Sequence, residues 1–347
     1  MGFNKGEWSE VYVFLNLLCN KKLMIVDSDL KIITKDIFEI LELILNQYRY
    51  KTIGNKICKF ELKDQVSEFE IDDIKNNLHT LLESLISHKS LNGSFEIPKL
   101  DFFLNKMFDS IKIKGKSKTK IDLAANILDN NLNREILLSY SIKSNLGSNP
   151  TLLNSSNHTN FIYEVTNIND SIMNECNNIS TKRKLIDRYR YLIAKKAKIN
   201  FINTQSDIFE HNLKMIDSNL SQIIANMLLV SYEKNQKNID ELLTCIISDK
   251  QSELFYKKKI SDFVNAISFG MRAGETWNGL NEVNGGLLVV TKEGEVYLLD
   301  LIYFKSEVEK YLIENIKLDS PSSTRYKMLE IYKYDNRYFF KLNLQIR

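Results

Sequence analysis

Asp122 and the triplet Ser141-Ile142-Lys143 have residue types and an order that are typical of phosphodiester cleavage. Such cleavage needs a nucleophilic water, charge stabilisation at phosphorus and help for the leaving 3′ oxygen, and divalent cations held by carboxylates supply much of this. One arrangement places an acid on one β-strand and an acid-x-lysine triplet on its neighbour. Because side chains alternate along a strand, the first and third residues of the triplet face the same way. The sequence has this layout, except that serine occupies the first position of the triplet.

Ser141 leaves the predicted site short of negative charge, because a neutral hydroxyl is a much poorer Mg²⁺ ligand than a carboxylate. Another acid should compensate, and we expect Glu10 to do so, with Glu164 in reserve. Lys143 would orient the water and stabilise charge developing on the phosphate, and the Ile142 carbonyl could also ligate the metal. With Mg²⁺ as the cofactor, the predicted catalytic and metal-binding residues are Glu10, Asp122, Ser141, Ile142, Lys143 and Glu164.

The same residues also have an interpretation without chemistry. Asp122 and Lys143 could form a cross-strand ion pair on a solvated face, worth under about 1 kcal/mol. Glu10 could simply stabilise its helix by interacting with the positive end of the helix dipole. Spacing alone leaves these alternatives open.

An amphipathic helix and a β-hairpin are predicted to carry the central residues. Apolar residues recur at helical spacing through residues 7–19, which predicts a helix with Glu10 near its start. Residues 119–128 and 135–144 are strand-like on either side of the polar turn Asp129-Asn130-Asn131, which predicts a hairpin. The acid and the lysine would then lie on paired strands.

The remaining pattern indicates an α+β protein with a helical middle and a β-rich end. Early segments are a hairpin at 22–26 and 30–34, an ambiguous segment at 37–48, a strand at 55–62, helices at 71–87 and 99–108, and a strand at 161–166. Residues 181–269 look helical, and strands are expected at 285–290, 295–302 and in a closing hairpin at 327–346.

Bulk composition decides little about function. The formal charge of +3, from 47 basic and 44 acidic residues, is too small to imply a polyanionic partner unless the positive groups are clustered. The four cysteines form no CxxC pair, so they predict reduced thiols rather than a zinc site or disulfides. A secretory signal and a long apolar segment are both missing from the sequence, so we expect a soluble, cytoplasmic protein with no membrane partner.

Basic clusters offer candidate contacts to DNA phosphates. Lysines surround Gly115 directly before the Asp122 strand, and Lys116, Lys118 and Lys120 are expected to neutralise phosphates beside a cut, although a solvated turn would explain them equally well. A second basic cluster lies between residues 182 and 198, where it could follow a DNA backbone or merely solvate a helix.

Base-reading candidates lie in polar or glycine-rich loops. A target made of G·C pairs would favour arginine, which can donate to both O6 and N7 of guanine, so Arg272 and Arg325 are candidate readers. The loop from Asn154 to Asn160 is a further candidate, Ser144 is a candidate DNA contact, and Trp277 could pack against DNA or against the protein core. His158 in the same loop is expected to be a bystander.

Several motifs in the same order along the chain resemble HpaII-type restriction endonucleases. They are Gly6-Glu7-Trp8-Ser9-Glu10, Tyr140-Ser141-Ile142-Lys143-Ser144 with Leu146-Gly147, Pro150-Thr151-Leu152-Leu153-Asn154, Gly270-Met271-Arg272, Thr276-Trp277, Gly285-Gly286 and Leu342-Asn343-Leu344-Gln345-Ile346-Arg347. Together these motifs span most of the chain, and their shared order is far more specific than a lone Asp and Lys.

The resemblance implies a PD-(D/E)XK-type nuclease core, with a mixed β-sheet flanked by helices, in residues 1–180. Residues 181–270 would be a helical region and 271–347 a β-rich region that recognises DNA. It also implies type II restriction of duplex DNA at unmethylated CCGG, a companion cytosine methyltransferase, and a serine-x-lysine triplet in place of the acidic one. Double-strand cutting makes a homodimer attractive.

Two other functions remain open on the sequence alone. Ser141 would suit a decayed nuclease that binds a specific DNA sequence without cutting it. The same charged residues would also suit a different phosphodiesterase, such as an RNA-acting or repair nuclease.

Overall fold

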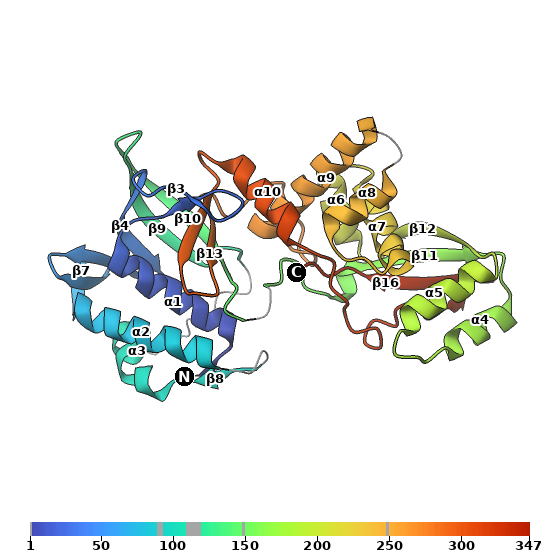
Figure 1. Cartoon of the computed structure of the whole chain (residues 1–347), viewed down its shortest axis with the longest axis horizontal. Coiled ribbons are helices and arrows are strands. Elements are labelled where there is room, and N and C mark those ends of the chain that lie inside the picture. The colour runs from blue at the N-terminus through green and yellow to red at the C-terminus, as the bar shows by residue number, and fades with distance from the viewer. Residues whose placement is uncertain (1, 89–92, 109–118, 148–149, 248–249) are drawn as a thin grey trace. The chain divides into compact units, whose positions relative to one another are not determined.

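The computed structural model describes residues 2–88, 93–108, 119–147, 150–247 and 250–347. The described chain divides into two compact units, whose elements are labelled in Figure 1. The first unit comprises Met1–Pro150 and Asn281–Tyr311, and the second comprises Thr151–Leu280 and Leu312–Arg347.

One large mixed β-sheet forms the centre of the first unit. Its strands are β2 (Ile25–Val26), β3 (Ile32–Thr34), β4 (Phe38–Leu45), β5 (Tyr48–Ile53), β6 (Lys56–Glu61), β7 (Asp64–Glu70), β9 (Leu123–Asp129), β10 (Arg134–Ser144), β13 (Gly286–Val290) and β14 (Val296–Asp300). Among the described residues, these ten strands follow the order β3-β2-β14-β13-β10-β9-β4-β5-β6-β7. The pairs β10–β13 and β14–β2 are parallel, whereas the other neighbours are antiparallel. The expected α+β fold with a mixed sheet flanked by helices is confirmed.

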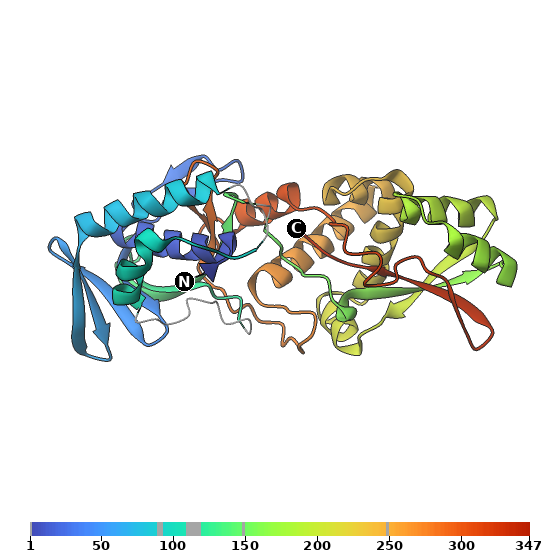
Figure 2. The same cartoon turned by 90° about the horizontal axis from the view of Figure 1, so that it is seen from below.

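Helices pack beside the sheet of the first unit. They are α1 (Lys5–Asn20), α2 (Ile71–Ser87), the 3₁₀ turn η1 (Pro98–Leu100) and α3 (Asp101–Phe108), and the short strands β1 (Gly2–Phe3) and β8 (Phe95–Glu96) pair with each other. Helix α10 (Lys305–Asn315) begins in the first unit and ends in the second. Asn4 starts α1 with a capping box, in which its side chain accepts from the Glu7 N–H and the Glu7 carboxylate accepts from the Asn4 N–H. Helices α1 and α2 lie side by side (Figures 1 and 2) and bury their apolar faces in the same core. The helix predicted at residues 7–19 is therefore confirmed.

The predicted hairpin is formed by β9 and β10, at the centre of the large sheet. The residues of β9 alternate between buried and partly exposed, and the buried Leu123, Ala125 and Ile127 join the core. The antiparallel register places Leu123 opposite Tyr140. Asp122 precedes β9 rather than lying within it, but its N–H still donates to the Tyr140 carbonyl at 2.9 Å.

The second unit combines a smaller sheet with a group of helices. In its described part, four strands follow the order β12-β11-β16-β15. The strands are β11 (Asn160–Thr166), β12 (Lys198–Thr204), β15 (Tyr332–Tyr334) and β16 (Arg337–Asn343). The helices are η2 (Asn157–Thr159), α4 (Asp170–Asn178), α5 (Lys184–Ala194), α6 (Asp207–Ile216), α7 (Leu220–Lys234), α8 (Ile239–Ile246) and α9 (Lys250–Phe269).

Strand β12 corrects the expectation of continuous helix from residue 181 to 269. Its short stretch Lys-Ile-Asn-Phe alternates polar and apolar residues, which suits a strand with one covered face. Phe201 packs against Phe161 and Tyr163 of the neighbouring β11. Helical segments before and after this short alternation masked it in the sequence.

The two units do not follow the domain boundaries expected near residues 180 and 270. The chain enters the second unit at Thr151, because β11 pairs with β16 close to the C-terminus. The expected β-rich region of residues 271–347 is shared, because β13 pairs in parallel with β10 of the first unit while β15 and β16 extend the second unit's sheet.

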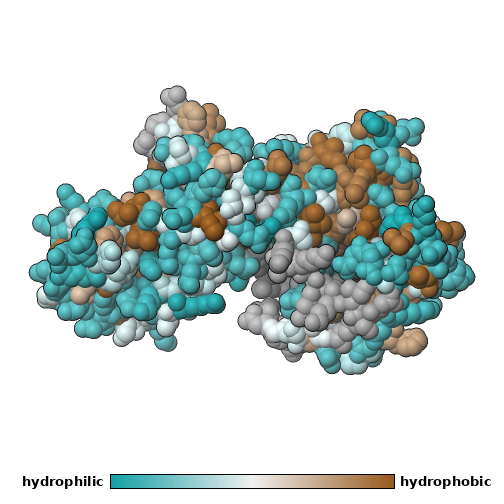
Figure 3. Space-filling view, turned by 180° about the vertical axis from the view of Figure 1, so that it is seen from behind, coloured by the Kyte–Doolittle hydropathy of each residue, from teal (hydrophilic) through white to brown (hydrophobic). Residues whose placement is uncertain are grey.

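The surface of the protein is mainly polar on the face drawn in Figure 3, where hydrophobic residues form smaller patches. Every helix within the described residues is too short or too polar to span a membrane.

Candidate active site

Asp122 is held at the start of β9 by bonds to the neighbouring strand. Its Oδ2 accepts a hydrogen bond from the Ile142 N–H at 2.7 Å and another from the Ser141 hydroxyl at 3.1 Å. With the Asp122 N–H bonded to β10 as well, both the main chain and the side chain are fixed. One carboxylate oxygen thus accepts protein hydrogen bonds, and among the described residues the other oxygen accepts none.

Lys143 lies on the same face of β10 as Ser141, because side chains two residues apart on a strand point the same way. Lys143 is partly buried, and within the described part of the chain it forms no ion pair with an acid. Asp122 takes its hydrogen bonds from Ser141 and Ile142 instead. The alternative interpretation of a simple Asp122–Lys143 ion pair is therefore not what the structure shows.

Glu10 of α1 is electrostatically coupled to both residues. Its pKa is raised to about 8, mainly because burial disfavours the charged carboxylate and next because Asp122 is negative, whereas Lys143 acts in the opposite direction. The Glu10 carboxyl therefore lies within electrostatic range of Asp122 and Lys143 in the first unit. Glu10 and Asp122 are two acids in one site, and the Glu10 carboxyl resists ionisation there. The site therefore lacks a positive charge that would balance both carboxylates.

A second contact anchors α1 to β10 next to these residues. The hydroxyls of Ser9 and Ser144 are hydrogen-bonded at 2.8 Å, and Ser9 also donates to the Lys5 carbonyl. Because Ser9 precedes Glu10 and Ser144 follows Lys143, the bond fixes the helix and strand that carry the acid and the lysine. Ser144, expected to contact DNA, thus has a structural contact as well, and its DNA contact stays a prediction.

The oxygen donors around Asp122 suit a small, hard cation. Mg²⁺ usually binds to proteins through one or two carboxylates and keeps several waters. Glu10 and Asp122 offer carboxylates, Ile142 offers a carbonyl, and the raised pKa of Glu10 indicates that a cation would relieve the crowding of negative charge. The described residues contain no group of three or more His, Cys, Asp or Glu that could hold a metal, which agrees with serine in the triplet.

Comparison with known proteins decides the family. The sequence profile of the HpaII restriction endonuclease matches residues 4–347. The chain is 32% identical to the type II restriction enzyme HpaII of Haemophilus parainfluenzae over 356 aligned positions, which cover 99% of this chain and 98% of that enzyme. The chain belongs to the HpaII restriction endonuclease family. No solved structure matches it.

Family membership confirms the resemblance and makes the chain a type II site-specific deoxyribonuclease, and therefore a DNA-binding protein.

Glu164, the reserve metal ligand, belongs to the second unit. Its carboxylate accepts a 2.6 Å hydrogen bond from Arg337 Nε, and this arginine lowers the pKa of Glu164. Within the first unit the structure brings Glu10 into electrostatic range of Asp122, and a metal-binding role for Glu164 stays a prediction.

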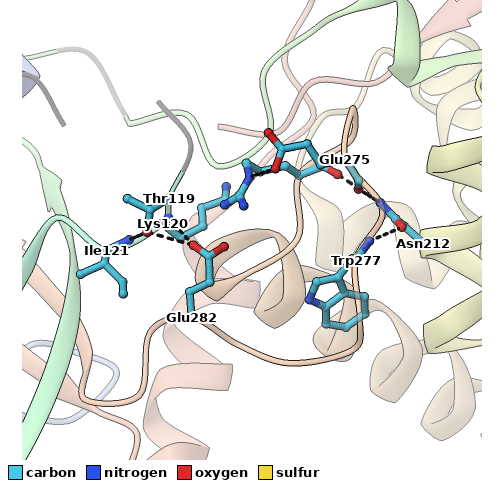
Figure 4. Close-up of polar contacts among 8 residues, drawn as sticks. Thr119, Lys120, Ile121, Asn212, Glu275, Trp277 and Glu282 are labelled. Atoms are coloured by element: carbon cyan, nitrogen blue, oxygen red, sulfur yellow. Dashed lines mark hydrogen bonds and ion pairs between the residues drawn. The ribbon is translucent and has the colours of Figure 1, made fainter. Parts of the chain in front are cut away.

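The candidate DNA contacts have different environments. Lys116 and Lys118 lie outside the described residues. The Lys120 N–H donates to the Glu282 carboxylate at 2.6 Å (Figure 4). Asn154 and Arg325 are exposed, which suits contact with a ligand.

Two further candidates lie on one loop of the second unit, which Figure 4 shows. Arg272 pairs with Glu275 at 2.9 Å. The Trp277 N–H donates to Asn212 Oδ1 at 2.9 Å, and its indole N–H donates to the Leu280 carbonyl. Asn212 also donates to the carbonyls of Arg272 and Glu275, so a single buried amide shapes the loop.

Asn160 is a structural residue, contrary to the expectation of a DNA contact. Only 2% of its surface is exposed, its amide donates to Gln205 Oε1, and its Oδ1 accepts from Asn343. Part of the second basic cluster is also structural, because the buried Arg188 donates to three backbone carbonyls of the second unit. A buried polar group needs such partners, and local sequence does not reveal burial.

Glu282 and Ser9 are the residues near the site that sequence reasoning missed. Ser9 lies beside Glu10 in the motif of the resemblance but has no chemistry of its own. Glu282 follows a glycine- and asparagine-rich loop, and its partners Thr119 and Lys120 are far away in sequence. No local signal could have identified it.

Metal binding is expected to strengthen as the pH rises towards about 8, because the Glu10 carboxyl must lose its proton to bind a cation. Below that pH the cation competes with the proton. Each unit by which the pH falls should therefore raise the half-saturating Ca²⁺ concentration by up to about tenfold. The measurement is the Ca²⁺ requirement for binding to a CCGG duplex between about pH 6 and 9. Glu10→Gln should abolish this pH dependence, and an equally steep dependence in that variant would contradict the role of Glu10.

Proposed function

We propose that this HpaII-family enzyme makes a Mg²⁺-dependent double-strand cut at unmethylated CCGG. The observation that carries the proposal is the convergence of Glu10, Asp122 and Lys143 around the Ser141-Ile142 segment of β10. The target sequence rests on the resemblance to the family and on 32% identity to HpaII over nearly the whole chain.

The proposed mechanism assigns a separate role to each residue. Asp122 and Glu10 would hold Mg²⁺ through carboxylate oxygens, with the Ile142 carbonyl as a further ligand. When bound, the ion would supply Lewis acidity at the phosphate and favour ionisation of the attacking water. Lys143 would orient the attacking water and stabilise the charge that develops on the phosphate oxygens. Ser141 donates to Asp122 and so keeps one carboxylate oxygen in place.

Serine in the triplet is therefore a structural part of the centre. An acid at position 141 would lie against the Oδ2 atom of Asp122, which already accepts the Ser141 hydroxyl. The negative charge comes from Glu10 instead, and the Ser9–Ser144 bond fixes the helix that carries it. This arrangement favours a working nuclease over a decayed one.

DNA recognition is assigned to residues of the second unit, of which Asn154 and Arg325 are exposed and Arg272 and Trp277 are partly buried. Arg272 and Arg325 would donate to guanine O6 and N7, while Asn154 and Trp277 would contact the DNA beside them. Lys116, Lys118 and Lys120 would contact phosphates next to the cut. A homodimer would bring two centres to the two strands of a symmetric site. A companion cytosine methyltransferase would protect the host's own CCGG sites. Both enzymes would work in the cytoplasm, because the host DNA lies there.

Digestion of DNA of known sequence tests the proposal. Purified protein with Mg²⁺ should give fragments whose ends all map to CCGG, and a chelator should stop the reaction. The same DNA methylated at the cytosines of CCGG should stay intact. Ends at another sequence, or cutting of the methylated DNA, would refute the proposed target. Failure to cut over a range of Mg²⁺ and salt concentrations, or equal cutting of duplex RNA, would refute the activity.

Lys143→Ala is expected to lower the single-turnover cleavage rate by about 10²–10³-fold, because the charge on the phosphate then lacks its stabilising ammonium group. Ca²⁺-supported binding of the duplex should change little. Lys292→Ala is the matched control, since Lys292 is exposed on the turn between β13 and β14. Equal cleavage rates for the two variants would remove Lys143 from the mechanism.

A further inference from the structure

A carboxylate from a distant part of the sequence holds the chain just before Asp122. Oε2 of Glu282 accepts hydrogen bonds from the Thr119 hydroxyl at 3.1 Å and from the Lys120 N–H at 2.6 Å. The Thr119 hydroxyl in turn accepts from the Ile121 N–H at 3.1 Å (Figure 4). One carboxylate oxygen therefore holds, directly or through Thr119, the three residues that lead into Asp122.

The same stretch of chain is also bonded to the other catalytic strand. The Ser139 N–H donates to Asn284 Oδ1 at 2.7 Å, and the Ser139 hydroxyl donates to the Glu282 carbonyl at 2.9 Å. The Gly285 N–H donates to the Ser139 carbonyl at 2.8 Å. We call residues 282–285 the clamp, because they bind the approach to Asp122 and, through Ser139, the approach to Ser141.

Close approach within the clamp depends on Gly285. A Cβ atom at this position would lie 2.5 Å from the Tyr140 ring and 3.0 Å from the Ser139 carbonyl oxygen. The clamp is therefore packed directly on β10, at the residues that precede the triplet. Its backbone cannot shift far, so the Glu282 carboxylate is presented from a rigid base.

The bonds of Glu282 fix two donors, the Thr119 hydroxyl and the Lys120 N–H, through a single oxygen. Catalytic groups must stay within about 0.5 Å of their productive position. Mutation of a partner that orients a metal ligand typically lowers metal affinity or activity by about 10–100-fold. Without Glu282, Thr119 and Lys120 lose these two hydrogen bonds to the clamp, whereas the bonds from Asp122 to β10 remain.

We propose that Glu282 is a positioning residue for Asp122, acting through Thr119 and Lys120. The inference rests on the proposed role of Asp122 in binding Mg²⁺. Glu282 acts as a hydrogen-bond acceptor in this role, so the identity of its Oε2 partners matters and its charge is secondary. Asn284 holds the clamp to β10 and supports the same arrangement.

Two replacements of Glu282 separate acceptance of hydrogen bonds from charge. Glu282→Ala removes the acceptor, and about 10–100-fold is expected to be lost from kcat, with KM changed less than about threefold. Glu282→Gln keeps one oxygen that can accept from both Thr119 and Lys120, so its kcat should stay within about fivefold of the unmodified enzyme. Glu293→Ala is the control, because Glu293 is exposed on the turn after β13.

A measurement without catalysis accompanies the kinetics. The Ca²⁺ concentration that half-saturates binding to a CCGG duplex should rise about tenfold or more in Glu282→Ala and stay unchanged in Glu282→Gln and Glu293→Ala. Thr119→Val provides a second variant, because it removes the hydroxyl that links Glu282 to the Ile121 N–H without creating a large cavity. It should shift the Ca²⁺ requirement in the same direction as Glu282→Ala.

The proposal is overturned if Glu282→Ala matches Glu293→Ala in kcat and in Ca²⁺ requirement. It is also overturned if Glu282→Gln falls as far as Glu282→Ala, because charge would then be the decisive property. If Glu282→Ala does not fold, Thr119→Val decides, and an unchanged Thr119→Val overturns the proposal. These outcomes compare variants with the unmodified enzyme, so they are distinct from a failure of that enzyme to cut CCGG.

Discussion

Asp122→Asn is expected to reduce the single-turnover rate of CCGG cleavage by about 10³-fold or more. The change removes the carboxylate charge that binds the cation, but the asparagine carbonyl can still accept the bonds from Ile142 and Ser141. The local structure should therefore survive. Binding of the duplex without metal should be equal or tighter, because one negative charge near the phosphates is gone.

The control for this variant is Asp64→Asn. Asp64 is exposed at the start of β7 in the same unit, so the substitution removes the same charge away from the candidate site. Cleavage measured on a radiolabelled duplex should be normal for Asp64→Asn and lost for Asp122→Asn. Comparable cutting by both would show that the catalytic centre lies elsewhere.

Glu10→Gln is expected to lower cleavage by about 10²-fold or more while stabilising the metal-free protein. The folded protein raises the pKa of Glu10 from 4.5 to about 8, so it favours the protonated carboxyl. The protonated Glu10 carboxyl contributes stability that is fully present below 4.5, its pKa in the unfolded chain. This stability is lost as the pH rises through about 8, its pKa in the folded protein. Glutamine carries no charge at any pH. Near pH 8 the free energy of unfolding of Glu10→Gln should therefore be higher than that of the unmodified protein by about 1–3 kcal/mol.

Thermal melting with and without Ca²⁺ measures the second part of this prediction. Added Ca²⁺ should raise the Tm of the unmodified protein, because a ligand that binds the folded state stabilises it, and should have little effect on Glu10→Gln. Glu293→Gln, an exposed neutralisation, should behave as the unmodified protein does. A Glu10→Gln variant that is less stable than this control, or that still cuts normally, would exclude Glu10 from the centre.

The central hairpin could be predicted from sequence because its signals are local. Alternation in residues 119–128 and 135–144 around a polar turn predicts a hairpin that pairs the segments of Asp122 and Lys143, and the structure pairs β9 with β10. The early helix is equally local, since its apolar spacing and its capping residues lie within one segment. The need for a compensating acid followed from charge, and the structure groups Glu10 with Asp122 and Lys143.

The features that sequence reasoning missed depend on contacts between distant segments. Parallel pairing of β10 with β13 joins residues far apart in the chain, and short buried strands carry no mark of their partner. The division into two compact units therefore differs from the boundaries expected near residues 180 and 270. Asn160 looks like any exposed polar loop residue until burial and its bonds to Gln205 and Asn343 are known. Glu282 is found only because the fold brings it to Thr119 and Lys120.

Anomalous diffraction from crystals of the protein bound to a CCGG duplex, with Mn²⁺ in place of Mg²⁺, tests the central claim most directly. We predict a metal peak within ligand distance of both the Asp122 and the Glu10 carboxylates, about 2.0–2.3 Å from their oxygens, with Lys143 next to the scissile phosphate. A metal bound at the scissile phosphate by other residues, with Asp122 and Glu10 away from it, would contradict the account.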